Sequence, residues 1–187
     1  MTQTASQHDR RRGIFAATSL IAIGFAGSTM ITPLYALYQA QFGFSAVMLT
    51  IVYAAYVIGN LSALLFLGRL SDRIGRRPIA FAAIGLCLVA ASVFLTAHST
   101  AWLFAGRVVS GLAVGLASGT GTAWLVDLRP DDRPRATLLA IQANMAGIGL
   151  GPLIAGLLAS YAPRPLVLPF LVYGAAIAMV AVMVTRT

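Results

Sequence analysis

The sequence predicts an all-α integral membrane protein, on the basis of its composition, its long apolar runs and the placement of its arginines. Of the 187 residues, 59% are hydrophobic and only 10% are charged. A soluble domain is typically about 45–50% apolar and about 25% charged. The chain therefore lacks the polar surface that would cover a water-soluble globule, and a lipid bilayer is its expected surrounding.

Six apolar runs are each long enough to cross a bilayer, which takes about 20 residues of helix. They are predicted as transmembrane helices over residues 13–38, 46–67, 78–96, 101–126, 136–159 and 166–184. Together they form one bundle over residues 13–184. Residues 1–12 are predicted as an N-terminal tail and residues 185–187 as the C-terminal end. The first run is longer than the apolar part of a secretory signal and is expected to stay in the protein.

Arginine placement predicts the orientation of the bundle. Of the 13 basic residues, all arginine, eleven fall in the two tails and in the loops after the second and fourth runs. Arg164 alone lies on the other side, and Arg107 lies within the fourth run. Because arginine concentrates in cytoplasmic loops, both termini are expected to be cytoplasmic.

A faint internal repeat accompanies this topology. A shift of the sequence places Gly59 on Gly147 and Gly68 on Gly156, so that three helices map onto three. Because three is odd, the two triplets run in opposite senses across the membrane. Inverted repeats of this kind are common in secondary transporters.

Several function classes have little support. Cys87 is the single cysteine, the two histidines are far apart, and the chain contains no glutamate, so neither a metal site nor an acid–base pair is expected. No cofactor and no enzymatic activity are predicted. The arginines lie in short loops between apolar runs, which favours topology over nucleic-acid binding as their explanation.

The loop between the second and third runs carries the most specific motif. Residues 68–78 read Gly-Arg-Leu-Ser-Asp-Arg-Ile-Gly-Arg-Arg-Pro, a charged turn with glycines at the points of closest approach. This spacing resembles the signature loop of the major facilitator superfamily, a family of transporters with two six-helix halves. The matching positions are Gly68, Asp72, Arg73, Gly75, Arg76 and Arg77.

Arg107 is the second feature, a basic side chain about 9 Å into the fourth helix. An arginine at this depth either faces a polar cavity or extends its side chain to the outer surface. Arg107 and Gly111 resemble the fourth-helix motif of the family, in which the arginine faces the transport cavity and is implicated in proton coupling. The other residues expected to line a cavity are polar or aromatic: Tyr53, Asn60, Gln142 and Asn144.

The fifth predicted helix contains a glycine-rich stretch around a proline. Pro152 cannot donate a backbone hydrogen bond and should bend the helix, as any transmembrane proline does. The pattern is also similar to a fifth-helix motif of antiporters in the family, drug exporters above all. Its residues here are Gly147, Gly151, Pro152 and Gly156, and Ala155 replaces a glycine.

Asp127, at the end of the fourth predicted helix, is the last candidate site residue. As a loop acid near several arginines it would contribute about 0–1 kcal/mol. The resemblance implies more, because in the family an acid at this place pairs with an arginine of the signature loop. Arg73 and Arg76 are the candidates, and the pair would form a cytoplasmic latch.

These features predict transport of a small molecule by alternating access, in the direction of efflux, with the chain as one half of a transporter. The alternatives are an uptake carrier for a metabolite and a membrane module that is inactive without a partner. The expected partners are the lipid bilayer, a small-molecule substrate, protons as a further candidate, and a second six-helix half. That half is either covalently linked in a longer protein or a second copy of the chain. The expected location is the plasma (inner) membrane.

Overall fold

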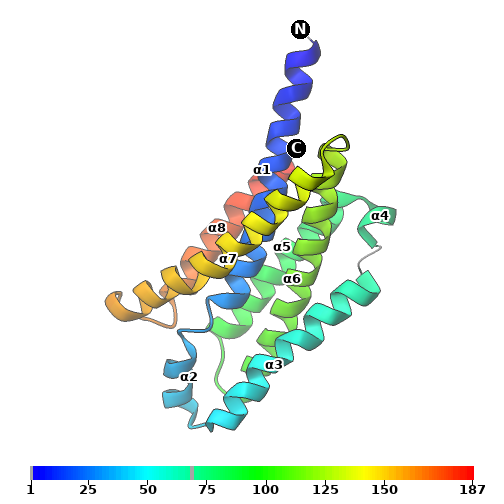
Figure 1. Ribbon diagram of the computed structural model, residues 1–187. Helices are drawn as coiled ribbons and strands as arrows, with labels where there is room; N and C mark the ends of the chain where they lie inside the picture. The colour runs from blue at the N-terminus through cyan, green and yellow to red at the C-terminus, as the bar shows by residue number, and fades with distance from the viewer. Residues whose placement is uncertain (1, 68–69) are drawn as a thin grey trace.

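The computed structural model describes residues 2–67 and 70–187, and every regular element in these ranges is a helix (Figure 1). Gly68, the first residue of the predicted signature, lies outside the described residues. The elements are α1 (Thr2–Thr29), α2 (Tyr35–Phe42), α3 (Ala46–Ser62), the π-helical turn η1 (Ala63–Leu67), α4 (Leu70–Ile74), α5 (Arg76–Leu95), α6 (Thr100–Leu128), α7 (Arg133–Tyr161) and α8 (Leu168–Thr185).

Five of the six predicted helices begin and end within a few residues of the observed α3, α5, α6, α7 and α8. The first differs, since the predicted helix 13–38 is two helices, α1 and α2, separated by a turn over residues 30–34. Pro33 explains the break, because it has no N–H to donate to Thr29 and its ring opposes a continuous helix. The turn is held by backbone hydrogen bonds between residues three apart in the sequence. Thr32 N donates to Thr29 O, and Leu34 N donates to Ile31 O. The predicted tail is also helical from Thr2 onward, as part of α1.

Five helical stretches of the described chain are long and apolar enough to cross a membrane, namely Ala46–Phe66, Arg76–Leu95, Thr100–Leu128, Arg133–Tyr161 and Leu168–Thr185. α1 is not among them, because arginines occupy its first half and its apolar part stops at Thr29. The two chain ends lie at the same end of the bundle (Figure 1). Whether α1 forms a sixth crossing stays a prediction.

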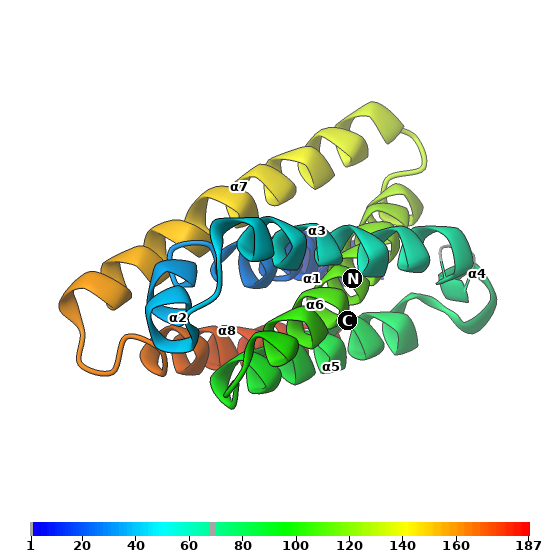
Figure 2. The same cartoon turned by 90° about the horizontal axis from the view of Figure 1, so that it is seen from below.

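The core of the bundle is built around α1 and α6. α6 packs against α1, α3, α5 and α7, and α1 also packs against α5 and α8. Leu20 and Ile21 of α1 and Leu103 and Leu125 of α6 are fully buried. Seen from below, α7 and α3 lie on one side of these two helices and α8 and α5 on the other (Figure 2).

Glycines set the closest helix crossings. A side chain on Gly59 would collide with the Val108 carbonyl, and one on Gly111 with the Tyr56 carbonyl, so α3 and α6 touch backbone to backbone. Gly147 meets the Ala22 carbonyl in the same way, which brings α7 against α1. Small residues at such crossings are typical of membrane helix pairs, which associate by close packing.

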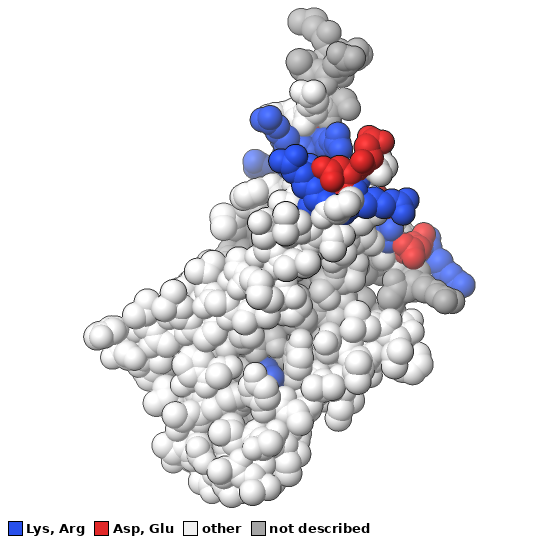
Figure 3. Space-filling view, viewed as in Figure 1, with Lys and Arg blue, Asp and Glu red and all other residues white. Residues whose placement is uncertain are grey.

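Charged side chains gather at one end of the molecule (Figure 3). This end contains the first turns of α1, the α6–α7 connection and the α4 segment (Figure 1). The rest of the visible surface is almost free of charge (Figure 3). We call the end at which the charged side chains gather the charged end. It corresponds to the side that the arginine pattern predicts to be cytoplasmic.

Candidate functional site: an arginine bridge and a polar cleft

The signature loop turns sharply at Gly75, between α4 and α5. Gly75 has φ = 104°, a left-handed backbone conformation that side-chain-bearing residues rarely adopt. α5 begins directly afterwards at Arg76. The turn brings the first residue of α5 beside α4, four residues after Asp72.

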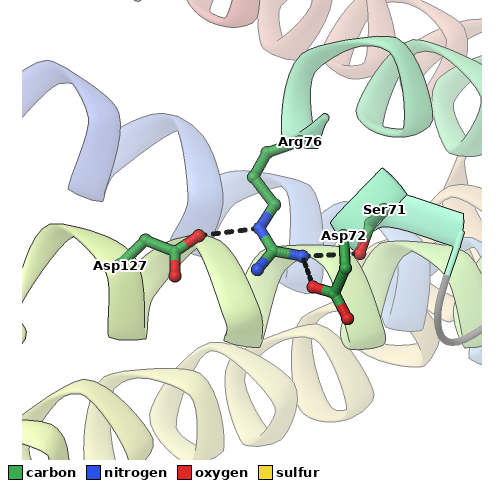
Figure 4. Close-up of polar contacts among 4 residues, drawn as sticks. All are labelled: Ser71, Asp72, Arg76 and Asp127. Carbon is green, nitrogen blue, oxygen red and sulfur yellow. Dashed lines mark hydrogen bonds and ion pairs between the residues drawn. The ribbon is translucent and has the colours of Figure 1, made fainter. Parts of the chain in front are cut away.

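Arg76 connects three acceptors through one guanidinium (Figure 4). Its Nε donates to Asp127 Oδ2 at 2.7 Å, on the last turn of α6. Its Nη1 donates to Asp72 Oδ1 at 2.5 Å and to Ser71 Oγ at 2.7 Å, both on α4. Of the two arginines expected to contact Asp127, Arg76 is therefore the one that does so, and we call this set the arginine bridge.

The arginine bridge is partly open to its surroundings. The Arg76 side chain is 20% exposed, while those of Asp72 and Asp127 are 60% and 54% exposed. Exposed pairs contribute only about 0–1 kcal/mol each because water competes for the charges. The bridge therefore joins α4, α5 and α6 by contacts that can break and re-form at small cost.

Two more arginines tie chain segments together at the charged end. Arg77 Nη2 donates to the Thr185 carbonyl at 2.8 Å, in the last turn of α8. Arg10 Nε donates to the Leu128 carbonyl at 2.6 Å, in the last turn of α6. Both bonds place a cation at a helix C-terminus, where unpaired carbonyls and the helix dipole favour positive charge.

Arg107 lies inside the bundle and is only 2% exposed. Its Nη1 donates to the Ser28 carbonyl of α1 at 2.7 Å, and its Nη2 reaches the Tyr53 carbonyl of α3 at 3.4 Å. The guanidinium also lies over the rings of Tyr53 and Tyr56, 4.8 and 5.0 Å from their centroids. Arg107 thus contacts three helices at once, and does not extend its side chain to the outer surface.

The four other predicted cavity residues do not share one site. Tyr53 lines an open cavity of about 470 Å³ between α2 and α3, at the end opposite the charges. Asn60 is half-buried at the α3–α6 crossing, where its backbone and side-chain oxygens face Gly115. Gln142 is exposed on α7, while Asn144 is half-buried.

Asn144 lies in a cleft of about 150 Å³ between α1, α6 and α7. We call it the α1–α6–α7 cleft, and its lining is Ile21, Phe25, Ser118, Thr122, Thr137, Ala140, Ile141 and Asn144. Sequence reasoning singled out Asn144 but not Thr137, which shares the face of Ala140 and Ile141 on α7. The four-residue spacing of Thr137 and Ile141 is the signal that could have identified it.

The fifth-helix motif packs α7 onto α1. Gly151 leaves room for the Ala26 carbonyl, which lies 2.5 Å from where its Cβ would be. Pro152 stands inside α7. Gly156 is looser, since its nearest neighbour is Pro33 at 3.7 Å. Three of the four motif residues thus lie at or next to the contact with α1, and the fourth is near the turn that follows α1.

Within the described residues, no group of three or more His, Cys, Asp or Glu side chains could hold a metal ion. Cys87, the single cysteine, is buried in α5.

A family model matches most of the chain, and known proteins match about half of it. The Major Facilitator Superfamily model matches residues 17–187. The Multidrug resistance protein MdtL of Klebsiella pneumoniae is 34% identical over 99 residues, which cover 53% of this chain and 25% of that protein. The MdtL proteins of Escherichia coli and Shigella boydii are each 38% identical over 103 residues, or 54% of this chain and 26% of theirs.

The chain thus spans about a quarter of the length of the curated relatives it matches. The family match covers nearly all of its helices, and the apolar helices identify it as a multi-pass protein of the inner membrane. With the arginine bridge at its charged end, the chain belongs to the major facilitator superfamily of membrane transporters.

Proposed function

We propose that the chain forms one six-helix half of a transporter that moves a small molecule across the membrane by alternating access. The family match and the charged end with its arginine bridge support this proposal. The name of the matched relatives, Multidrug resistance protein, favours efflux over uptake of a metabolite. The glycine-rich contact of α7 with α1, in the pattern of antiporters, also favours efflux.

The arginine bridge is the observation that carries the proposal. In alternating access two bundles rock about a central site, and one end closes while the other opens. Arg76 joins α4, α5 and α6 at the charged end. Its weak, exposed contacts suit a latch that stabilises the outward-open state and is released in each cycle.

The cavity residues divide into two roles. Arg107 fixes α1, α3 and α6 relative to one another, and its buried charge makes it the candidate for coupling to protons or to a charged group. Tyr53, Asn60, Gln142 and Asn144 lie on helices that surround the substrate path. Gln142 is exposed in the isolated bundle, which is the position expected of a residue that meets the second half.

The second half has two sources. It is either a further six helices in the same polypeptide or a second copy of this chain, paired about an axis along the membrane normal. α3 and α7 are suited to contact the second half, because both expose large apolar side chains. On α3 these include Ile51, Val57, Ile58 and Leu61, and on α7 they include Ile141, Met145, Leu153 and Leu157. A module that is inactive without an unrelated partner is the remaining alternative.

Accumulation of fluorescent dyes in cells that lack their own exporters tests the proposal. Cells that express the chain, alone or with the rest of its polypeptide, should accumulate less of the uncharged dye dansylamide, which carries an N–H donor, than control cells. Asp127→Asn should reduce the rate of efflux several-fold and leave dye binding unchanged, because it breaks the latch and not the cavity. Unchanged accumulation in both arrangements would contradict transport, and crosslinking in membranes would show whether two copies pair.

A further inference from the structure

The α1–α6–α7 cleft combines space with polar side chains in a part of the chain that is otherwise apolar. Its volume of about 150 Å³ exceeds what one water needs by roughly tenfold. Along α7, Thr137 and Asn144 lie about 6 and 16 Å from the first residue, Arg133. The cleft therefore lies within membrane depth, on the side of the charged end.

The helices leave this cleft open because of how they diverge. α6 and α7 are joined at the charged end and separate away from it, and α1 lies between them in both views (Figures 1 and 2). Gly121 packs on Ile21 and closes one side of the cleft, while Gly147 brings α7 onto α1 beyond it. Between these contacts the small side chains of Ser118 and Ala140 leave the space unfilled.

Two of the hydroxyl groups of the cleft have already donated their protons. Ser118 Oγ donates to the Gly115 carbonyl at 3.3 Å, and Thr137 Oγ1 donates to the Arg133 carbonyl at 3.1 Å. A hydroxyl that donates in this way keeps its lone pairs as acceptors. Within the described residues, Asn144 Oδ1 is buried and receives no hydrogen bond. An acceptor left unpaired at membrane depth is costly, so a bound molecule that donates a hydrogen bond to this oxygen would be favoured.

Charge is missing from the cleft. None of its eight lining residues is ionisable at neutral pH. A cationic ligand would find no counter-ion there and would also meet the arginines of the charged end, Arg133 and Arg135 among them. An anionic ligand would find no basic side chain in the lining. The apolar part of the lining, Ile21, Phe25 and Ile141, suits an aromatic or aliphatic body.

We propose that the α1–α6–α7 cleft is a substrate subsite for uncharged amphipathic molecules that donate hydrogen bonds through a hydroxyl or amide N–H. Asn144, Ser118 and Thr137 accept from that group, and Phe25 packs against the apolar body. This rests on the proposed function, since it names the class of molecule that the transporter takes. Asn144 and Thr137 are the residues that determine specificity.

The test compares ligands that differ only in their donor, on the chain in lipid nanodiscs. para-Butylphenol carries an O–H, para-butylanisole replaces that proton by a methyl group, and para-butylbenzylamine is a cation at neutral pH. Binding is measured by saturation-transfer NMR, with protein-free nanodiscs subtracted to remove partition into lipid. The phenol should bind about 10-fold more tightly than the anisole, because one neutral hydrogen bond corresponds to about 2–10-fold in affinity.

Matched variants locate the preference. Asn144→Leu removes both hydrogen-bonding atoms at similar volume and should bring the phenol-to-anisole ratio close to one. Thr137→Val removes one hydroxyl from an exposed position, where folding is little affected, and should lower the ratio about 2–10-fold. Ser92→Ala is the control, because Ser92 Oγ also donates to a carbonyl of its own helix but lies on α5, outside the cleft.

A ratio near one in the unmodified chain, or tighter binding of the amine, would overturn the inference. So would a ratio that survives both Asn144→Leu and Thr137→Val. Should Asn144→Leu fail to fold, Thr137→Val decides alone. Loss of dye efflux with an intact ratio would count against the proposed transport and leave the subsite standing, so the two failures are distinguishable.

Discussion

Arg107 illustrates how a buried cation is accommodated without a carboxylate partner. Two backbone carbonyls and two tyrosine faces surround its guanidinium. Cation–π contacts of this kind contribute about 0.5–2 kcal/mol each, more when water is excluded. The planar guanidinium can donate to Ser28 and Tyr53 while it stacks on both rings, which a lysine ammonium cannot do.

Arg107→Lys should therefore destabilise the bundle although it keeps the charge. The lost contacts are the second hydrogen bond and the stacking, so we expect a loss of about 1–3 kcal/mol in the free energy of unfolding. The measurement is unfolding of the purified chain by sodium dodecyl sulfate in mixed micelles. Arg164→Lys is the control, because Arg164 is exposed in the α7–α8 connection. Equal stability of the two variants would show that the hydrogen bonds and ring contacts of the Arg107 guanidinium do not stabilise the bundle.

For single residues, the sequence predicts which side chains form a site better than it predicts which residues each of them contacts. The acid at position 127 was expected to meet Arg73 or Arg76, and the choice depends on the turn at Gly75 that directs Arg76 toward α6. Ser71 was not expected in the arginine bridge, although it neighbours Asp72. Arg107 was expected to face a cavity, and its burial follows from Tyr53 and Tyr56, whose spacing of three residues places them on one face of α3.

Helices cross most closely where a glycine leaves no side chain between them. Two glycines of α6, one at a helix crossing and one away from it, allow this effect to be compared. A Cβ on Gly111 would meet the Tyr56 carbonyl and the Asn60 nitrogen of α3. A Cβ on Gly119, eight residues along the same helix, meets nothing within 4 Å. Glycines recur every four residues along α6, at positions 111, 115 and 119. The first two of them contact α3 and η1, and Gly119 does not.

Gly111→Ala should destabilise the bundle by about 1–3 kcal/mol, because the methyl group must push two backbones apart. Gly119→Ala should be neutral or stabilising by up to about 1 kcal/mol, since alanine favours the helix and fills open space. Detergent unfolding of both variants gives the comparison. Destabilisation of similar size at the two positions would show that helix propensity, and not the α3–α6 crossing, decides.

The helices themselves were largely predictable because apolar length determines them, and five of six agree with the structure within a few residues. The break after Thr29 was harder to foresee. Proline is often tolerated in a membrane helix, as Pro152 is in α7. Pro33 ends a helix instead, and its apolar neighbours hide this in the sequence.

Over the whole molecule, charge and packing point to the same orientation. The chain ends and α4 lie toward one end (Figure 1), and the cavity beside Tyr53 lies between α2 and α3 toward the other. If both chain ends face the cytoplasm, the number of crossings is even and α1 must cross the membrane. If α1 does not cross, the five apolar stretches place the two chain ends on opposite sides.

Single cysteines distinguish these two arrangements, in a background where buried Cys87 is replaced by alanine. Ser99, before α6, and Tyr161, the last residue of α7, are exposed at the end opposite the charged end, and His8 and Asp131 are exposed at the charged end; each is changed to cysteine in turn. A membrane-impermeant maleimide should label the first two in intact cells and the last two only after the membrane is opened. Labelling of His8→Cys but not Asp131→Cys in intact cells would mean that α1 does not cross the bilayer, because α1 is the one long helix between position 8 and the start of α3. With six crossings, the first turns of α1 lie in the same compartment as the arginine bridge, as the arginine pattern predicts.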